Sequence, residues 1–139
     1  MIQLSFSSAL TIHDHIHLSP TREAGGLLFG AEGVVNFAAT MVNQAGDPER
    51  EFIVDPYSLA AMVEDYLERG QQLLGTFHSH PNGRAFMSKQ DVVLARQTGL
   101  LLVVATGEVW DWVVFDPGAG GQVRFTIAPP RGLPEPRSM

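Results

Sequence analysis

The sequence predicts an α/β (α+β) fold, with a mixed central β-sheet flanked by helices in one domain. The chain has 139 residues, 45% hydrophobic and 17% charged, which are the size and composition of one globular domain. Apolar runs of strand length alternate along it with segments of helical periodicity. We expect the domain to span residues 1–128 and the Pro-rich residues 129–139 to form a flexible tail, because they hold no apolar run to bury.

The composition excludes several classes of protein. With no cysteine, the chain has no disulfide, cysteine nucleophile or thiolate zinc site, so a metal would need His and carboxylate ligands. A net charge of −6 opposes nucleic-acid binding. No apolar run is long enough to span a membrane, and Met1–Leu10 has neither the basic segment nor the long apolar run of a secretory signal. We therefore expect no nucleic-acid or membrane partner and a cytoplasmic location.

Two helices and several strands are predicted in the N-terminal half. Ala9, Ile12 and Ile16 recur at helical spacing, which predicts a helix over Ser8–His17. A second helix follows Asp55 as N-cap and Pro56 at its first position, and ends near Gly70; its apolar stripe from Leu59 to Leu67 is expected to be core. The predicted strands are Met1–Phe6, Gly26–Gly30, Val34–Val42 and Glu51–Val54, with a hairpin turn at Gly30–Gly33.

The C-terminal half is expected to add the central strand and an antiparallel pair. The uninterrupted apolar run Leu100–Thr106 predicts a strand buried on both faces. Val109–Phe115 and Gly121–Ile127 flank a Pro-Gly turn and should pair antiparallel. Before them, Leu73–His80 predicts a strand, and a helix should run from Ser88 to about Gln97, with Gly99 near its C-cap.

Two histidines on the strand Leu73–His80 suggest a metal site. Alternate side chains of a strand share one face, so His78 and His80 should point the same way, with Cα atoms about 6–7 Å apart. Asp91, near the start of the next helix, is placed to supply a third ligand. Three protein ligands would leave one zinc position for water, as in catalytic rather than structural sites.

The same residues also have an ordinary structural interpretation. Ser88 and Asp91 have the spacing of a capping box, in which each side chain bonds to the backbone of the other. Paired histidines also occur as polar positions at the end of a sheet. The pattern His78-x-His80 alone favours the structural role; together with Pro81, the Asn82-Gly83 turn and Asp91, a metal site and a structural role fit about equally well.

A wider set of residues resembles a known family. The pattern Glu23…His78-x-His80-x(7)-Ser88-x(2)-Asp91 resembles the JAMM motif of the JAB1/MPN/Mov34 metalloproteases. Three further segments are similar to that family: Gly26–Gly30, Phe52–Pro56 and Leu74–Pro81. The resemblance covers about Pro20 to Thr106, and the chain looks like a minimal, prokaryotic-type member.

The resemblance implies a fold, an ion and residue roles. The fold would be the cytidine-deaminase-like JAB1/MPN fold, with one Zn²⁺ held by His78, His80 and Asp91. Glu23 would act as general base and then acid toward the attacking water, and Ser88 would position that water and stabilise the oxyanion. The implied activity is hydrolysis of a peptide or isopeptide bond after the C-terminal tail of a ubiquitin-like or sulfur-carrier protein. Oligomeric state stays open, with a homodimer among the alternatives.

The chain departs from the family pattern in three ways. Met87 stands where many relatives have proline before the motif serine, and Ala24 where many bacterial relatives have cysteine; neither exchange removes a catalytic atom. The short chain has little room for the insertions by which eukaryotic deubiquitinating members grip ubiquitin. A preference for one ubiquitin-chain linkage therefore cannot be carried over.

Other interpretations compete with the metallopeptidase. A non-catalytic MPN scaffold domain is the main alternative, although such members generally lose ligands that this chain keeps. A zinc nucleoside deaminase lacks support because the chain has no Pro-Cys-x-x-Cys motif. A DNA-repair relative is disfavoured by the acidic balance.

Two further side-chain groups have both a functional and a structural interpretation. His13, His15 and His17 could form a second metal cluster: on a helix His13 and His17 would share a face, and on a strand all three would. Surface histidines with no ligand role are the alternative. Trp110 and Trp112 could form an exposed platform, but a half-buried sheet surface is the commoner outcome.

Overall fold

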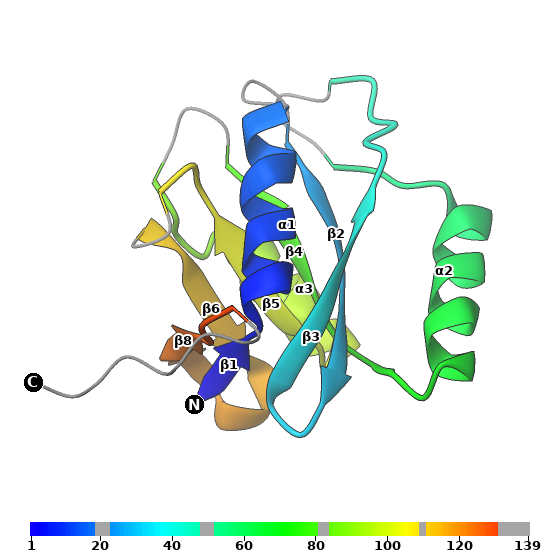
Figure 1. Cartoon of the computed structure of the whole chain (residues 1–139). Helices are drawn as coiled ribbons and strands as arrows, with labels where there is room; N and C mark the ends of the chain where they lie inside the picture. The colour runs from blue at the N-terminus through cyan, green and yellow to red at the C-terminus, as the bar shows by residue number, and fades with distance from the viewer. Residues whose placement is uncertain (19–22, 48–51, 81–83, 109–110, 131–139) are drawn as a thin grey trace, which may run out of the picture.

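We describe the protein from a computed structural model covering residues 1–18, 23–47, 52–80, 84–108 and 111–130 (Figure 1). Its three α-helices are α1 (Phe6–Leu18), α2 (Pro56–Glu68) and α3 (Lys89–Thr98), and a 3₁₀ turn, η2, spans Pro117–Ala119. The strands are β1 (Ile2–Leu4), β2 (Gly25–Ala31), β3 (Val34–Met41), β4 (Gln72–Ser79), β5 (Leu101–Ala105), β6 (Val113–Asp116), β7 (Gly121–Val123) and β8 (Phe125–Ile127).

The strands form one mixed sheet in the order β7-β6-β5-β4-β2-β3-β1-β8. β2 pairs antiparallel with both β3 and β4, whereas β4 and β5 are parallel, as are β1 and its two neighbours. β7 and β8 lie at opposite ends of this order although only Arg124 separates them in the chain. The sheet therefore curves until its two ends approach each other, and the Ile2 N–H donates to the Arg124 carbonyl (3.1 Å).

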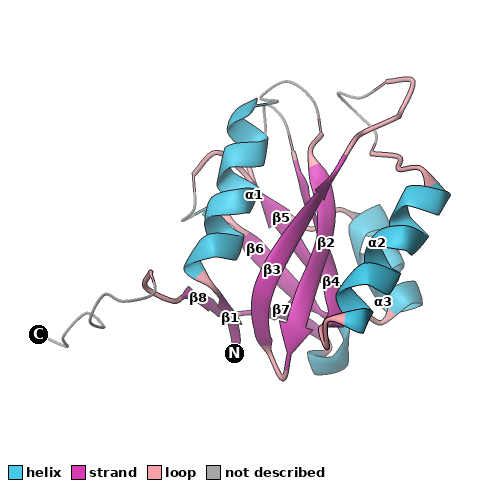
Figure 2. Cartoon of the chain, turned by 45° about the vertical axis from the view of Figure 1, so that its right-hand side comes forward, coloured by secondary structure: helices cyan, strands magenta, loops and turns pink. Residues whose placement is uncertain are grey.

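The helices cover opposite faces of the sheet, with α1 on one face and α2 and α3 on the other (Figures 1 and 2). On the α1 face, Ile12 and Ile16 pack with Leu28, Phe77 and Val103. Two separate apolar clusters lie on the other face, one beneath α2 and one beneath α3. The architecture is the predicted mixed sheet flanked by helices.

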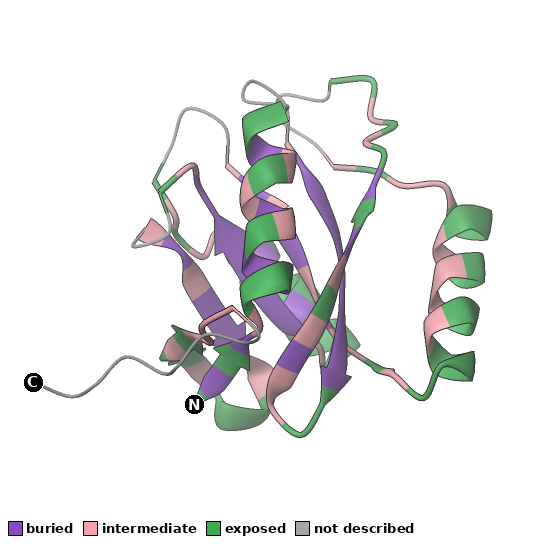
Figure 3. Cartoon of the chain, viewed as in Figure 1, coloured by how far each residue is buried: buried purple, intermediate pink, exposed green. Residues whose placement is uncertain are grey.

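Burial is greatest in the strands at the centre of the sheet (Figure 3). All five residues of β5 are buried, which confirms the prediction of a central strand covered on both faces. The hairpin between β2 and β3 is also confirmed, with Glu32 and Gly33 at positive φ (50° and 79°). This buried centre carries His78 on β4, and His80 follows directly after that strand.

Several element predictions need correction. The predicted strand Glu51–Val54 is wrong over its described part, Phe52–Val54, because the backbone there bonds to the Asn43 side chain and to Gln44 instead of a strand of the sheet; Glu51 lies outside the described residues. The predicted strand Gly121–Ile127 is two strands: β7 pairs with β6 as expected, but β8 pairs with β1. The helix predicted over Ser8–His17 is longer at both ends, Phe6–Leu18.

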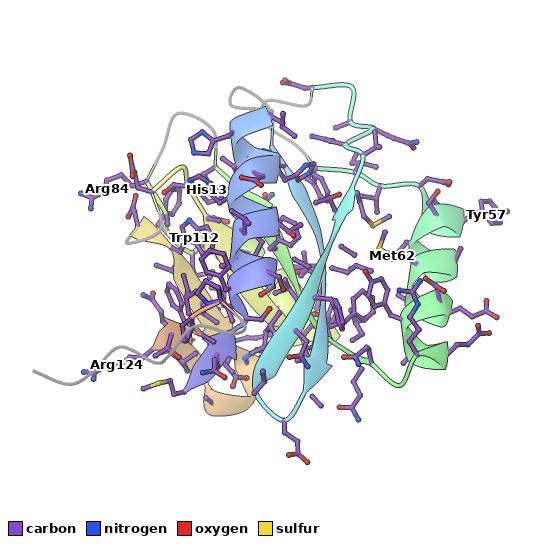
Figure 4. The ribbon with its side chains drawn as sticks, in the orientation of Figure 1. His13, Tyr57, Met62, Arg84, Trp112 and Arg124 are labelled. Atoms are coloured by element: carbon purple, nitrogen blue, oxygen red, sulfur yellow. The ribbon has the colours of Figure 1, made fainter. Side chains whose placement is uncertain are left out.

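Helix α2 is less buried than its apolar stripe predicts. No residue of α2 is fully buried, and Leu67 is 52% exposed. Its inward residues, Met62 and Tyr66 among them, are partly buried against the cluster around Phe29, whereas Tyr57 points away from the sheet (Figure 4). The helix starts at the predicted N-cap, where the Asp55 side chain accepts hydrogen bonds from the Tyr57 and Ser58 N–H groups.

Candidate metal centre

Strand β4 orients the two histidines of the site. Phe77 and Ser79 are buried on the α1 side of the sheet, so the alternating His78 and His80 point to the opposite face. Their ring centroids are 5.0 Å apart, which confirms that they share a face. β4 ends at Ser79, one residue earlier than predicted, and His80 follows it with its N–H directed at the Ala105 carbonyl (3.4 Å).

The N-terminus of α3 supplies Ser88 and Asp91 beside these rings. Ser88 is the N-cap: its Oγ accepts from the Asp91 N–H (3.1 Å), and its own N–H donates to Asp91 Oδ2 (3.0 Å). This is the capping box that the spacing predicts. A hydroxyl that accepts one hydrogen bond keeps its own O–H as a donor. Ser88 can therefore cap α3 and still donate a hydrogen bond.

The Asp91 carboxylate reaches both imidazoles. Asp91 Oδ1 lies 2.9 Å from His78 Nε2, and Asp91 Oδ2 lies 3.5 Å from His80 Nε2. The exposed fractions of the side chains of His78, His80 and Asp91 are 15%, 14% and 11%. The same carboxylate therefore completes the capping box and contacts both histidines.

The residues of this cluster are of the types that bind zinc. The two His–Asp distances, 2.9 and 3.5 Å, are to different oxygens of the Asp91 carboxylate. His80 Nδ1 is buried with no hydrogen-bond partner among the residues that the structure describes. Two imidazole nitrogens and a carboxylate oxygen are ligands that Zn²⁺ accepts.

The electrostatics of the cluster favour a charged carboxylate. Burial alone would raise the pKa of Asp91, but hydrogen bonds from His78 and His80 outweigh it and hold that pKa well below its ordinary range. The hydrogen bond to Asp91 raises the pKa of His80, and burial opposes this only in part. Each partner thus stabilises the charged form of the other, and a divalent cation would meet an ionised carboxylate here.

Glu23 is held close to the histidines by a cross-strand contact that the sequence did not suggest. Buried Ser79 accepts a hydrogen bond from the Ala24 N–H at its Oγ (2.8 Å), and its own N–H donates to the Ala24 carbonyl (2.9 Å). Ligand atoms of Glu23, His78 and His80 all lie within 4.8 Å of one another. The structure therefore brings the five predicted site residues together: Glu23, His78, His80, Ser88 and Asp91.

Asn43 and Phe86 also border the centre and were missed. Asn43 Nδ2 donates to the Glu23 carbonyl (2.9 Å), and its Oδ1 accepts from the N–H groups of Ala45 and Ile53. Phe86 is 56% exposed, with its ring 4.8 Å from that of His80. Asn43 is twenty residues from Glu23 in sequence, so no local pattern could have identified it. An exposed aromatic residue between two motif elements was the available signal for Phe86.

The other candidate groups have different outcomes. His13 and His17 share a face of α1, as predicted for a helix, with Nε2 atoms 2.9 Å apart. Trp112 is only 4% exposed and donates from Nε1 to the Thr106 carbonyl (2.8 Å), so its packing role is confirmed and the platform is wrong for this residue. Trp110 lies outside the described residues.

No helix in the described ranges is long and apolar enough to cross a membrane.

Comparison with known proteins gives a consistent result. The family model of prokaryotic homologs of the JAB domain matches residues 7–118. The solution structure of protein DSY2949 from Desulfitobacterium hafniense is similar, with a TM-score of 0.75, 26% identity and coverage of 91% of this chain and 92% of that one. Among curated proteins, no sequence matches the chain.

Two more distant structures share the fold. One is AF2198, a JAB1/MPN domain protein from Archaeoglobus fulgidus (TM-score 0.63, 19% identity, 91% and 98% of the two chains covered). The other is described as JAMM, a metalloprotease-like zinc site in the proteasome and signalosome (TM-score 0.61, 18% identity, 93% of this chain and 99% of that chain covered). On this shared fold, Glu23, His78 and His80 form a candidate metal site. The chain belongs to the prokaryotic branch of the JAB1/MPN (JAMM) family.

Proposed function

We propose that this protein is a zinc metallopeptidase that hydrolyses a peptide or isopeptide bond. The observation that carries the proposal is the convergence of Glu23 with His78 and His80, whose ligand atoms all lie within 4.8 Å of one another, beside Asp91. His78, His80 and Asp91 would hold one Zn²⁺. When bound there, zinc lowers the pKa of a water molecule toward neutrality and polarises a carbonyl.

Glu23 would move the proton during hydrolysis. Its carboxylate would take a proton from the attacking water and deliver it to the leaving amine, which typically accelerates a reaction about 10²–10⁴-fold. The hydrogen bonds from the Ala24 N–H to Ser79 Oγ and from Asn43 Nδ2 to the Glu23 carbonyl would limit movement of this segment. Ser88 would donate its O–H to the oxyanion while Oγ caps α3.

The substrate we propose is the C-terminal tail of a ubiquitin-like or small sulfur-carrier protein. Family membership supports this choice by analogy. The exposed ring of Phe86 beside His80 offers an apolar contact for a residue next to the scissile bond. Cleavage would release the carrier with a free C-terminal carboxylate.

Cleavage of fusion proteins tests the activity. The zinc-loaded protein is incubated with ubiquitin-like and sulfur-carrier proteins that carry a C-terminal extension, and products are followed by mass spectrometry. Glu23→Gln keeps the shape of the side chain but removes the base, so we expect a loss of at least about 10²-fold. Glu64→Gln, an exposed carboxylate of α2, is the matched control and should retain full activity.

The alternative is a non-catalytic MPN scaffold, and metal uptake separates the two. A metallopeptidase should bind one zinc per chain at the centre and lose it in a His78→Gln, His80→Gln double variant. Full cleavage by Glu23→Gln would reject the assigned base. Failure of the purified protein to take up zinc would favour the scaffold.

A further inference from the structure

Helix α1 carries a histidine pair that the candidate centre does not use. His13 and His17 are four residues apart on α1, with Nε2 atoms 2.9 Å apart and ring centroids separated by 4.2 Å. The buried side of the helix is formed by other residues, Ile12 and Ile16 among them. The pair is therefore not part of the core packing of α1.

The position of the pair leaves it open to an ion from solvent. His17 is exposed, and the side chain of His13 is 36% exposed. The His17 ring lies over Gly107, where a Cβ added to the glycine would lie 3.9 Å from Cε1 and 4.0 Å from Nε2. These are ordinary van der Waals distances, so Gly107 is a direct neighbour of the His17 imidazole.

The nitrogen separation matches two neighbouring ligands of one metal ion. Two nitrogens about 2.0–2.1 Å from an ion lie about 2.9 Å apart when they subtend 90°, and about 3.3 Å apart in a tetrahedron. The Nε2 separation of 2.9 Å corresponds to the 90° arrangement of square-planar or octahedral sites, which Cu²⁺ and Ni²⁺ prefer. A shift of a few tenths of an ångström would admit Zn²⁺.

A carboxylate lies near the second ring nitrogen of His13. Asp14 Oδ1 is 3.6 Å from His13 Nδ1, the ring nitrogen opposite the one that faces His17; this distance is too long for a hydrogen bond. Metal-bound histidines commonly have a hydrogen-bonded carboxylate at this nitrogen, so Asp14 would have to move closer to fix the ring. A direct hydrogen bond between the imidazoles also suits this geometry, and an ion would take the place of the shared hydrogen.

We propose that His13 and His17 form a second metal site, which binds one divalent transition-metal ion through both Nε2 atoms. Solvent water would complete its coordination. The order of affinity should be Cu²⁺ above Ni²⁺ and Zn²⁺, as for nitrogen sites in general. This site is independent of the proposed peptidase activity, because it shares no residue with the candidate centre.

Metal binding to the untagged protein tests this inference. Cu²⁺ uptake is measured by equilibrium dialysis at pH 8, where an ordinary imidazole is neutral, and nitrogen coordination is read from the electron paramagnetic resonance spectrum. The wild type should bind one Cu²⁺ per chain more than His13→Gln or His17→Gln. Each variant should bind at this site at least about 10²-fold more weakly, because the second imidazole no longer acts at high effective concentration.

Two controls locate the ion. His15→Asn removes the histidine between the pair and should leave uptake unchanged. The His78→Gln, His80→Gln double variant should retain the additional ion with its nitrogen signal. Circular dichroism checks that α1 is intact in each variant. Equal Cu²⁺ affinity and stoichiometry in the wild type and His17→Gln would overturn the proposal, as would loss of the ion only in His15→Asn.

Discussion

Ser79 connects the segment that carries Glu23 to the strand that carries both histidines. Its side chain is buried, and it exchanges two hydrogen bonds with the backbone of Ala24 (2.8 and 2.9 Å). An unsatisfied buried N–H costs about 1–3 kcal/mol, so this contact also stabilises the fold. Ser79 lies between His78 and His80 in the sequence, but its side chain makes this contact on the opposite face of the sheet.

Substitutions of Ser88 can distinguish its role as the N-cap of α3 from a role in the proposed hydrolysis. Ser88→Gly should change the free energy of unfolding by only a few tenths of a kcal/mol, because glycine is tolerated at an N-cap. If Ser88 stabilises the oxyanion, this variant should still lose about 10²-fold in cleavage rate. Ser88→Thr keeps the hydroxyl and is the matched control. Chemical denaturation and the fusion-cleavage assay provide the measurements; wild-type cleavage by Ser88→Gly would assign the residue to capping alone.

His15 should make folding stability depend on pH. Burial lowers its pKa from the ordinary 6.5, although a backbone contact to Met41 opposes this in part, and its Nε2 has no hydrogen-bond partner in the described part of the chain. The unfolded chain therefore binds a proton more readily than the folded one. The stability contribution is complete above pH 6.5 and is lost as the pH falls through the folded-state pKa.

The variant His15→Asn removes this titration. Between pH 7.5 and pH 5, the wild type should lose more unfolding free energy than the variant, as measured by urea denaturation at each pH. Other titrating groups are common to both proteins and cancel in the difference. Equal losses in the two proteins would show that folding does not lower the pKa of His15.

At the scale of single residues, the sequence was informative where local spacing carries the chemistry. His78 and His80 follow the strand period, and Ser88 and Asp91 follow the capping-box spacing, so both pairs could be predicted. Asn43 could not, because its contact to the Glu23 carbonyl depends on the path of a loop. Glu23 was assigned only through a resemblance, because nothing local links it to β4.

Among the elements, β2 has the tightest steric requirement. A Cβ on Gly26 would overlap the Ala39 carbonyl oxygen of β3 and lie 2.8 Å from the Phe77 ring. Gly26→Ala should therefore lower the free energy of unfolding by more than about 2 kcal/mol, since the central sheet cannot separate without losing pairing. The control is Gly46→Ala, where a Cβ would meet no atom within 4 Å. Equal midpoints in thermal denaturation would contradict this steric role of β2.

Elements with complete local signals were predicted well. Helix α3 has its N-cap at Ser88 and its C-cap at Gly99 (φ 71°), and β5 is an unbroken apolar run. The segment Phe52–Val54 has strand-like residues, but its backbone is bonded to Asn43 and Gln44. Periodicity identified the inward face of α2 but not how much of it is covered, because coverage depends on tertiary packing.

At the scale of the whole molecule, the path of the last strand could not be predicted. The sequence of Gly121–Ile127 predicts a single strand. In the structure, the chain pairs with β6 as far as Val123 and then pairs with β1 from Phe125. No local residue pattern distinguishes these partners, because the choice depends on the curvature of the entire sheet.

Truncation tests both β8 and the predicted domain boundary. Removing residues 129–139 should leave the thermal midpoint unchanged, as expected for a tail. Removing residues 124–139 deletes β8 and its ladder with β1, including the bond from the Ala128 N–H to the Leu4 carbonyl (2.9 Å). The longer deletion should lower the midpoint by several degrees or prevent folding. Identical midpoints for both truncations would contradict the role of β8.

The pairing of Ile2 with Phe125 also has a consequence for synthesis on the ribosome. Translation adds about 5–20 residues per second, so β1 would emerge roughly 6–25 s before its outer neighbour is made. Through that interval Ile2 and Leu4, both buried in the finished fold, would lack the strand that covers them. The pairing of β1 with β8 would therefore be among the last contacts of the sheet to form during synthesis.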